Sequence, residues 1–255
     1  MTKTCFVTAT DEFYLDTTRV LLRSLSRNYS GQEPLDVFVY VSRDLVNHDF
    51  GIVNKNLNIK LLYPEGIKEH EDSRLITKMY KNTLFTGASM YRFYVGDLPA
   101  EYTKAVYVDP DCVIARDISP VIDYELKVPL AAFHEIQANY ADNPEFADSA
   151  YFNSGVMIID LDYWRKNDLG NELINLAYNF TNWTGASDQD ILNVVFRNLW
   201  APLNVNFNYL LNIYKNLDVP DPIIVHFAGK TKPWNSPISG HKWRELWKHY
   251  HTTTY

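Results

Sequence analysis

Two aspartates separated by a single residue, Asp109 and Asp111, directly follow the apolar run of residues 105–108. Alternate residues of an extended strand point to the same side and lie about 6 to 7 Å apart, so the two carboxylates face one way. Pro110 fixes its own φ and biases Asp109 toward extended geometry, which stiffens the loop. Two close carboxylates repel each other unless a cation or a proton lies between them. The pattern therefore predicts a site for a hard divalent ion with oxygen ligands.

The Asp-x-Asp spacing occurs three times, and the sequence context distinguishes the pairs. The other two pairs are Asp160/Asp162 and Asp188/Asp190. Only Asp109 and Asp111 directly follow a β-rich run, which is where open α/β sheets present ligand-binding residues. For Asp160 and Asp162 we favour a structural interpretation, in which they end a strand and start a helix.

The first predicted strand ends in TATDEFYLDTT, which places Asp11 and Tyr14 in a strand-to-helix loop. In a doubly wound sheet, that loop receives a nucleotide. An Asp can accept the imide N–H of a base, and a Tyr ring can stack on the base. The chain has no GxGxxG motif, which favours a mononucleotide diphosphate over a dinucleotide. The structural alternative is a capped helix start with Tyr14 in the core, and this segment alone does not separate the two.

The segment HFAGKTKPW places His226 at the end of the last predicted strand, followed by Gly229, Lys230 and Lys232. An imidazole that joins two carboxylates suits Mn²⁺ better than Ca²⁺. The glycine allows the backbone to approach a phosphate closely, and a lysine adds a mobile positive charge. A single histidine at a strand end is more often structural, but the glycine and the lysines favour a ligand.

Two polar segments, SDQD at 187–190 and FNSG at 152–155, carry groups that bind sugar hydroxyls. Carboxylates accept hydrogen bonds from hydroxyls, and amides donate or accept them. We expect Ser187 to cap a helix, with Asp188 and Asp190 in its positive first turn. Each segment has a structural alternative, which is a helix cap for the first and a strand-entry turn for the second.

The composition predicts one large globular domain. The chain has 255 residues, of which 46% are hydrophobic, enough for a substantial core. The formal charge of -7 argues against broad nucleic-acid binding, which needs a basic face. Cys5 and Cys112 lie in apolar, strand-like contexts that suit buried thiols in a reducing compartment. No segment approaches 18 apolar residues and none reads as a signal peptide, so we expect a cytoplasmic protein.

Strand-like and helix-like patterns alternate in the first half, which is typical of a mostly parallel sheet covered by helices. We expect strands at residues 3–9, 35–41, 58–63, 104–108, 128–133, 155–160 and 223–227. We expect helices from a cap at 16–18 to near 31, within 82–95, from 162 toward 180, and from 187 onward. The predicted fold class is therefore α/β.

Five segments occur together in an order that resembles the retaining glycosyltransferase family 8. They are TATDEFY, YVDPDC with IARD after it, YFNSGVMIIDLDYWR, SDQDILN and HFAGKTKPW. The sequence most resembles bacterial lipooligosaccharide and lipopolysaccharide α-galactosyltransferases and α-glucosyltransferases, over residues 3–234. The resemblance implies a GT-A fold, which is a Rossmann-like nucleotide-binding mixed sheet flanked by helices in a single domain. We expect residues 1–240 to form the catalytic domain and residues 241–255 a short aromatic and basic helix.

The resemblance also implies how a UDP-hexose donor is bound. Asp109, Asp111 and His226 would hold Mn²⁺, or alternatively Mg²⁺, across the diphosphate. The other expected contacts are Ala9, Thr10, Asp11 and Tyr14 at the uracil, Arg92 near the sugar and phosphates, Asn153, Ser154, Asp188 and Gln189 at the sugar, and Gly229 and Lys232 at the diphosphate.

The implied reaction transfers the hexose with retention of configuration. The metal and Lys232 would stabilise charge on the departing UDP while an oxocarbenium-like centre forms at the sugar C1. Gln189 and Asp188 are the expected catalytic residues, because the Gln189 carbonyl would lie near the opposite face of that cation. Asp190 is an alternative candidate for a carboxylate nucleophile. A covalent intermediate and same-face attack both stay open.

The acceptor is less defined, and an oligosaccharide, a glycolipid or a glycoprotein all fit the resemblance. Phe13 occupies a position where the galactosyltransferases often carry a polar residue. Trp243, Trp247 and Tyr250 fall on one face of the expected final helix. We favour docking of that face on the catalytic domain. The alternative is a peripheral contact with the inner face of a membrane that carries a lipid-linked acceptor.

Three other functions are alternatives. Phosphatases of the haloacid-dehalogenase type carry Asp-x-Asp after a strand, as in AVYVDPDCV, but the chain lacks a downstream Asp-Asp or Gly-Asp pair. A sugar-nucleotide-binding protein without transferase activity would use the same contacts. A self-glucosylating protein similar to glycogenin would use one of the 18 tyrosines. Galactose and glucose differ by one hydroxyl configuration, which no motif here distinguishes.

Overall fold

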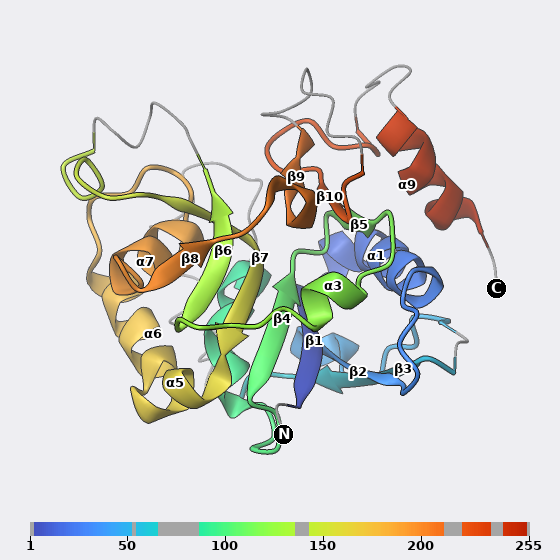
Figure 1. Cartoon of the computed structure of the whole chain (residues 1–255), viewed down its shortest axis with the longest axis horizontal. Coiled ribbons are helices and arrows are strands. Elements are labelled where there is room, and N and C mark those ends of the chain that lie inside the picture. Colours follow the sequence, from blue (N-terminus) through green and yellow to red (C-terminus); the bar gives the residue numbers. More distant parts are fainter. Residues whose placement is uncertain are drawn as a thin grey trace.

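A seven-stranded mixed sheet runs through the centre of the molecule, with helices on both faces (Figure 1). The computed structural model describes residues 3–52, 55–65, 87–135, 143–211, 221–235 and 242–253. The strand order in the sheet is β3-β2-β1-β4-β7-β6-β8. These strands are β1 (Thr4–Thr10), β2 (Leu35–Val41), β3 (Leu57–Leu62), β4 (Lys104–Val108), β6 (Leu130–His134), β7 (Phe152–Asp160) and β8 (Trp200–Pro202).

Strands β1 to β4 are parallel, and the mostly buried runs of β1, β2 and β4 lie between the helices of the two faces. Their carboxyl ends therefore meet at one edge of the sheet. Strand β7 pairs antiparallel with β4, with Val156 opposite Val108. This pairing places the beginning of β7, which carries the FNSG segment, beside the two aspartates that follow β4.

A second, three-stranded sheet lies beyond the carboxyl end of β4 (Figure 1). It consists of β5 (Cys112–Ile114), β10 (Ile224–His226) and β9 (Tyr209–Leu210). Strand β10 pairs antiparallel with β5, so that His226 lies opposite Cys112, and parallel with β9. Because the chain passes from β4 to β5 through Asp109 and Asp111, the small sheet brings the last predicted strand to these aspartates.

Two apolar layers cover the two faces of the main sheet. Along β1, Cys5 and Val7 pack into one layer and Phe6 into the other, as the alternation of side chains in a strand requires. The helices of the first layer are η3 (Gly87–Asp97), α5 (Leu161–Lys166), α6 (Leu169–Asn179) and α7 (Asp188–Val195). Those of the second are α1 (Leu15–Arg27) and α3 (Ser119–Ile122). Short turns of helix are η1 (Glu12–Tyr14), η2 (Arg43–Leu45) and η4 (Val205–Phe207).

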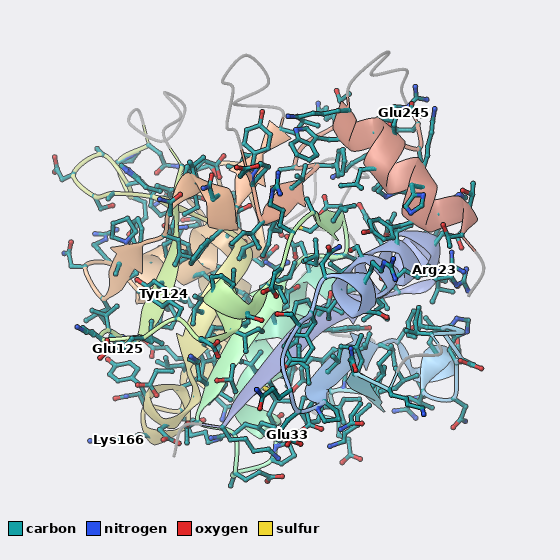
Figure 2. All side chains as sticks on the ribbon, turned by 45° about the vertical axis from the view of Figure 1, so that its right-hand side comes forward. Arg23, Glu33, Tyr124, Glu125, Lys166 and Glu245 are labelled. Atoms are coloured by element: carbon teal, nitrogen blue, oxygen red, sulfur yellow. The ribbon has the colours of Figure 1, made fainter. Side chains whose placement is uncertain are left out.

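The last helix, α9 (Lys242–Thr252), docks on α1. Trp247 and Tyr250 are buried in the contact. Arg23 of α1 donates to the carbonyls of Tyr250 and His251, both at 3.0 Å, and Asn28 donates to the Tyr250 hydroxyl at 2.8 Å. Figure 2 shows Arg23 where α1 meets α9, with Glu245 near the opposite end of α9. Trp247 and Tyr250 of the aromatic face are therefore used inside the molecule, as the favoured docking interpretation predicted.

Four local expectations need correction or confirmation. Strand β7 begins at Phe152, so FNSG is part of the strand and not a turn before it. The predicted helix from 162 to 180 is two helices, because Asp168 adopts the left-handed conformation with φ of 51°. Ser187 makes no side-chain cap to α7, so its predicted capping role is wrong. Asp160 does cap α5, accepting from Tyr163 at 2.9 Å, which confirms the structural interpretation. Residues 82–86 of the helix expected within 82–95 lie outside the described residues.

Candidate active site

The Asp-Pro-Asp segment is held by backbone hydrogen bonds from both sheets. The N–H of Asp109 donates to the carbonyl of Gly155 at 2.8 Å, which extends the pairing of β4 with β7. The N–H of Phe227 donates to the carbonyl of Asp111 at 3.0 Å, which connects the segment to the end of β10. Asp111 is buried and Asp109 is partly exposed. Both carboxylates thus have fixed positions at the carboxyl edge of the main sheet.

His226 faces these aspartates because β10 pairs with β5. Its Nε2 lies 3.3 Å from Oδ1 of Asp111. A Cβ built on Gly155 would lie only 2.1 Å from Cε1 of His226 and 2.9 Å from Oδ2 of Asp109. The imidazole and the carboxylate therefore approach the same point of β7, and the missing side chain of Gly155 leaves the room for both.

The ligand atoms available here fit a divalent metal ion. Single ligand atoms of Asp111, Cys112 and His226 lie within 4.8 Å of one another. Burial raises the pKa of the Cys112 thiol well above its usual range. Within this group, the carboxylate of Asp111 and the imidazole of His226 are donors that many divalent ions accept, whereas a thiol suits softer metals.

Lys232 is a buried lysine whose ammonium contacts the Asp111 carboxylate directly. It also donates to the carbonyl of Phe227 at 2.8 Å. Burial by itself would raise the pKa of Asp111, but the neighbouring Lys232 and His226 outweigh it and hold that pKa below its usual range. Gly229 has φ of 80°, a left-handed conformation that favours glycine, in the turn between His226 and Lys232. Lys230 in the same turn is exposed.

Arg92 of η3 connects the aspartates to β7 and α7. Its Nη2 donates to Oδ1 of Asp109 at 2.7 Å. Its Nη1 lies 3.2 Å from Oδ2 of Asp188 and donates to the carbonyl of Ser154 at 2.9 Å. The guanidinium carbon lies 4.5 Å from the centre of the Tyr107 ring, which is a cation–π distance. This buried arginine therefore has fixed ion-pair partners on two different elements.

The two carboxylates of the SDQD segment differ in their environments. Burial raises the pKa of Asp188 to about 6, although the Arg92 guanidinium opposes the shift. Asp190 accepts from the hydroxyl of Tyr151 at 2.6 Å and from the N–H and hydroxyl of Thr184 at 2.9 and 2.6 Å. Asp190 thus holds the loop before α7, whereas Asp188 lies beside Arg92. The Asp190 alternative for the nucleophile is disfavoured by these contacts.

Asn153 and Gln189 form an amide network between β7 and α7. The Asn153 Nδ2 donates to Oε1 of Gln189 at 3.1 Å and to Oε2 of Glu135 at 3.0 Å. The Gln189 Nε2 donates to the same Glu135 oxygen at 3.2 Å, and the N–H of Ser154 donates to Oε1 of Gln189 at 3.0 Å. The four residues expected at a sugar, Asn153, Ser154, Asp188 and Gln189, are therefore neighbours.

The first strand-to-helix loop follows β1 and includes η1. Oδ1 of Asp11 accepts from two backbone N–H groups of η1, at 3.0 and 3.3 Å, so the helix-cap interpretation holds for this oxygen. Burial raises the pKa of Tyr14, with further contributions from Asp111 and Asp109. The Tyr14 ring meets the ring of Trp234 edge-on, with centroids 6.4 Å apart. Ala9 and Thr10 are buried at the end of β1.

Four residues of this site were not singled out from the sequence. Glu135 follows strand β6 directly, a position like that of Asp109 after β4, and this signal was available. Gly155 and Trp234 lie inside segments that were recognised as motifs. Asn208, which contacts both Asn153 and His226, has no local pattern around it that marks it.

A separate surface hollow of about 680 Å³ opens at the amino-terminal edge of β1 and β4. Thr4, Lys104 and Tyr124 are among the residues that line it, and Tyr124 is labelled in Figure 2. The hollow contains none of the residues predicted to bind a ligand. The chemistry-bearing side chains gather at the opposite, carboxyl edge of the sheet.

Known proteins share this architecture. The crystal structure of the galactosyltransferase LgtC with donor and acceptor sugar analogs superimposes with a TM-score of 0.78 at 19% identity, covering 98% of this chain and 97% of LgtC. An active-site mutant of LgtC gives a TM-score of 0.80 at 20% identity, covering 97% and 95%. These likenesses confirm the predicted GT-A fold in a single domain.

Sequence relatives give the family. GlyB, a glycosyltransferase of Streptococcus pneumoniae serotype 4, is 27% identical over 84% of this chain, which spans 54% of GlyB. Lipopolysaccharide 1,2-glucosyltransferase of Escherichia coli (strain K12) is 28% identical over 55% of this chain, which spans 45% of that protein. The chain thus spans about half the length of these two relatives. The model of glycosyl transferase family 8 matches residues 5–237. The chain therefore belongs to glycosyltransferase family 8.

Proposed function

We propose that this protein is a retaining hexosyltransferase that moves galactose or glucose from a UDP-sugar to a glycan or glycoconjugate acceptor. The observation that carries the proposal is the cluster of Asp109, Asp111 and His226, with Arg92 and Lys232 in contact with its carboxylates. Metal ligands with two cations beside them suit a diphosphate leaving group. The two hexoses are those named by the galactosyltransferase LgtC and the lipopolysaccharide glucosyltransferase.

We assign Asp109, Asp111 and His226 as ligands of Mn²⁺, with Mg²⁺ as the alternative. When bound, the ion would supply Lewis-acid stabilisation of the negative charge on the diphosphate. Two of the three N–H donors of Lys232 are engaged by the Asp111 carboxylate and the Phe227 carbonyl, and we assign the third to a phosphate oxygen. The turn at Gly229 would let the backbone approach those oxygens.

The uracil is assigned to the loop after β1. Oδ1 of Asp11 is engaged by the backbone of η1, so Oδ2 is the oxygen we assign to the imide N–H of the base. The Tyr14 ring would stack on the base, and its contact with Trp234 holds the ring in place. Ala9 and Thr10 would contact the nucleotide through their backbone.

The hexose is assigned to the network between β7 and α7. Asn153 and Ser154 would bind its hydroxyls, while Gln189 and Asp188 would lie beside C1. An amide carbonyl or a carboxylate there stabilises developing positive charge. Arg92 contacts both Asp109 and Asp188, so it orients the metal side and the sugar side together. Two retaining routes are consistent with this set, a covalent intermediate on Asp188 and same-face attack with Gln189 below the ring.

The acceptor is proposed to be an oligosaccharide, a glycolipid or a glycoprotein. None of the helices in the described ranges is long and apolar enough to cross a bilayer. We propose a cytoplasmic location, since Cys5 and Cys112 are free and buried. Because Trp247 and Tyr250 are buried, any membrane contact of α9 would be made by its charged side chains. We treat residues 1–240 as the catalytic unit and residues 241–255 as a supporting helix.

The test is release of UDP when the protein is mixed with Mn²⁺ and each of a panel of UDP-sugars without acceptor. We expect slow hydrolysis of one donor by the wild type and about 10²-fold or greater loss in Asp111→Asn, because one ligand of the metal becomes neutral. Asp123→Asn, an exposed aspartate remote from the cluster, is the matched control and should keep wild-type release.

Each negative result has a distinct meaning. Donor binding by calorimetry without turnover against water or any acceptor would favour the non-catalytic sugar-nucleotide-binding protein. A mass increase on incubation with donor alone would reveal self-glucosylation. The absence of both donor binding and donor hydrolysis would overturn the proposal. Membership in family 8 leaves the phosphatase alternative without support.

A further inference from the structure

The amide groups around His226 have defined directions because backbone N–H groups fix them. The N–H of Gly155 can only donate, and it points at one side-chain atom of Asn153 from 3.1 Å. That atom must be the Oδ1 of Asn153, because the amide nitrogen has no acceptor capacity. The orientation of the Asn153 amide is thereby determined by the fold.

The direction of Asn208 follows from that of Asn153. The Asn208 atom that lies 2.9 Å from Oδ1 of Asn153 must be the donor Nδ2. Its Oδ1 therefore faces Nδ1 of His226, at 3.0 Å. A carbonyl oxygen only accepts, so Nδ1 of His226 must carry the hydrogen.

A hydrogen on Nδ1 leaves the lone pair of a neutral imidazole on Nε2. Nε2 is the nitrogen that faces Asp111, at 3.3 Å. The opposite tautomer would place two acceptors against each other at Asn208 and would point an N–H at the metal ligands. The contact is also rigid, because Asn208 is fully buried and strand β9, which follows it, pairs with β10 at Leu210 and His226.

We propose that Asn208 is a positioning residue that fixes His226 in the tautomer able to bind a divalent cation through Nε2. The inference rests on the proposed function, because it concerns the same metal site. A partner that accepts from the second ring nitrogen of a ligating histidine typically accounts for 10- to 100-fold in metal affinity. Here that partner is the neutral amide of Asn208, whose Nδ2 donates to Asn153 in the amide network between β7 and α7.

The experiment measures Mn²⁺ affinity in the presence of UDP, by electron paramagnetic resonance of free Mn²⁺, together with melting temperature. Asn208→Ala should weaken Mn²⁺ binding by roughly 10- to 100-fold. Asn208→Asp keeps an oxygen beside Nδ1 and should bind Mn²⁺ within a few fold of wild type, although both variants lose the donation to Asn153 and melt at lower temperature. The matched control is Asn204→Ala, which removes the cap of η4 in the same segment and should leave Mn²⁺ affinity unchanged.

Unchanged Mn²⁺ binding in Asn208→Ala, or equal losses in Asn208→Ala and Asn208→Asp, would overturn the inference and leave Asn208 a structural residue. If the alanine variant does not fold, the tautomer is read directly by ¹⁵N NMR of the wild type with Mg²⁺ and UDP. Hydrogen on Nδ1 of His226 supports the inference, and hydrogen on Nε2 overturns it. Absence of metal binding in the wild type would instead overturn the metal assignment of the proposed function.

Discussion

Gly155→Ala is the substitution that tests the geometry of the metal cluster most directly. The new Cβ would lie 2.1 Å from Cε1 and 2.8 Å from Nδ1 of His226, and 2.9 Å from Oδ2 of Asp109. To reach the 3.4 Å of an ordinary contact, the imidazole would have to retreat by about 1.3 Å. The imidazole is buried and its Nδ1 contacts the fully buried Asn208, so a retreat of the ring disturbs packed neighbours.

The expected cost has two parts. Overpacking of a filled interior typically destabilises a protein by about 1–3 kcal/mol. A displacement of about 1 Å in a reacting constellation can lower the rate by about 10²-fold, and a ligand moved that far leaves metal coordination range. We therefore expect Gly155→Ala to fold with reduced stability and to lose most of its Mn²⁺-dependent UDP release. Backbone strain is not the cause, because Gly155 lies in an extended strand.

Urea unfolding and calorimetric titration of Mn²⁺ with UDP measure the two parts separately. The double variant Gly155→Ala/His226→Ala is the internal control, because removing the imidazole removes the main clash. Its destabilisation should be smaller than the sum of the single effects by roughly 1 kcal/mol or more, as contacting residues require. The described crowding of His226 and Asp109 at β7 would be refuted if Gly155→Ala bound Mn²⁺ as tightly as the wild type. It would also be refuted if the double variant lost as much unfolding free energy as the two single variants together.

Two further predictions concern the buried carboxyl and the last helix. Asp188 has a folded pKa of about 6, raised above its unfolded value, so its contribution to stability is present at low pH and is lost as pH rises toward 6. Between pH 4 and 7, the free energy of unfolding of the wild type, measured with urea, should fall by on the order of 3 kcal/mol relative to that of Asp188→Asn. If the two unfolding free energies change with pH in parallel, this prediction is wrong. Trp247→Ala should lower stability by about 3–5 kcal/mol and weaken UDP binding, because Trp247 packs on Trp234, which contacts Tyr14. The control Lys248→Ala, on the exposed face of α9, should change neither the stability nor the UDP affinity. An unchanged UDP affinity in Trp247→Ala would show that α9 does not support the proposed donor site.

Seven strands were predictable because bounded apolar runs mark them, whereas β5, β8 and β9, which have two or three residues, were not predicted. The predicted bounds of β2 and β4 agree with the structure, and β1 is displaced by one residue. Strand β7 was predicted three residues too short, because FNSG has the composition of a turn. In the sheet, Phe152 and Asn153 pair with His134 and Phe133 after a register shift in β6, and this pairing overrides local propensity.

The helix ends show a different kind of failure. The apolar pattern runs through Asp168, and only the left-handed backbone at that residue separates α5 from α6. Ser187 precedes a helix as predicted, yet its backbone has φ of 62° and its hydroxyl makes no cap. In both cases tertiary packing selects a conformation that the local residue types do not require.

The candidate site was predictable where its residues follow strands and was not where they meet only in space. Asp109, Asp111 and His226 lie at strand ends, and the sheet topology brings these ends together. Asn208 contacts Asn153 and His226 across 55 and 18 residues of sequence, through a sheet whose strands are two and three residues long. Strand β9, which directly follows Asn208, has only two residues and gives no sequence pattern, so the placement of Asn208 could not be foreseen.

The docking of α9 has a consequence for the order in which the molecule assembles. Arg23 and the Tyr250 carbonyl are 227 residues apart, and Tyr14 meets Trp234 over a similar separation. Contacts between such distant parts of a chain close large loops and form late in folding. The loop proposed to hold the base reaches its final environment only when Trp234 has reached Tyr14 and α9 has docked on α1. The proposed donor site would thus be completed only after the strands of the main sheet have paired.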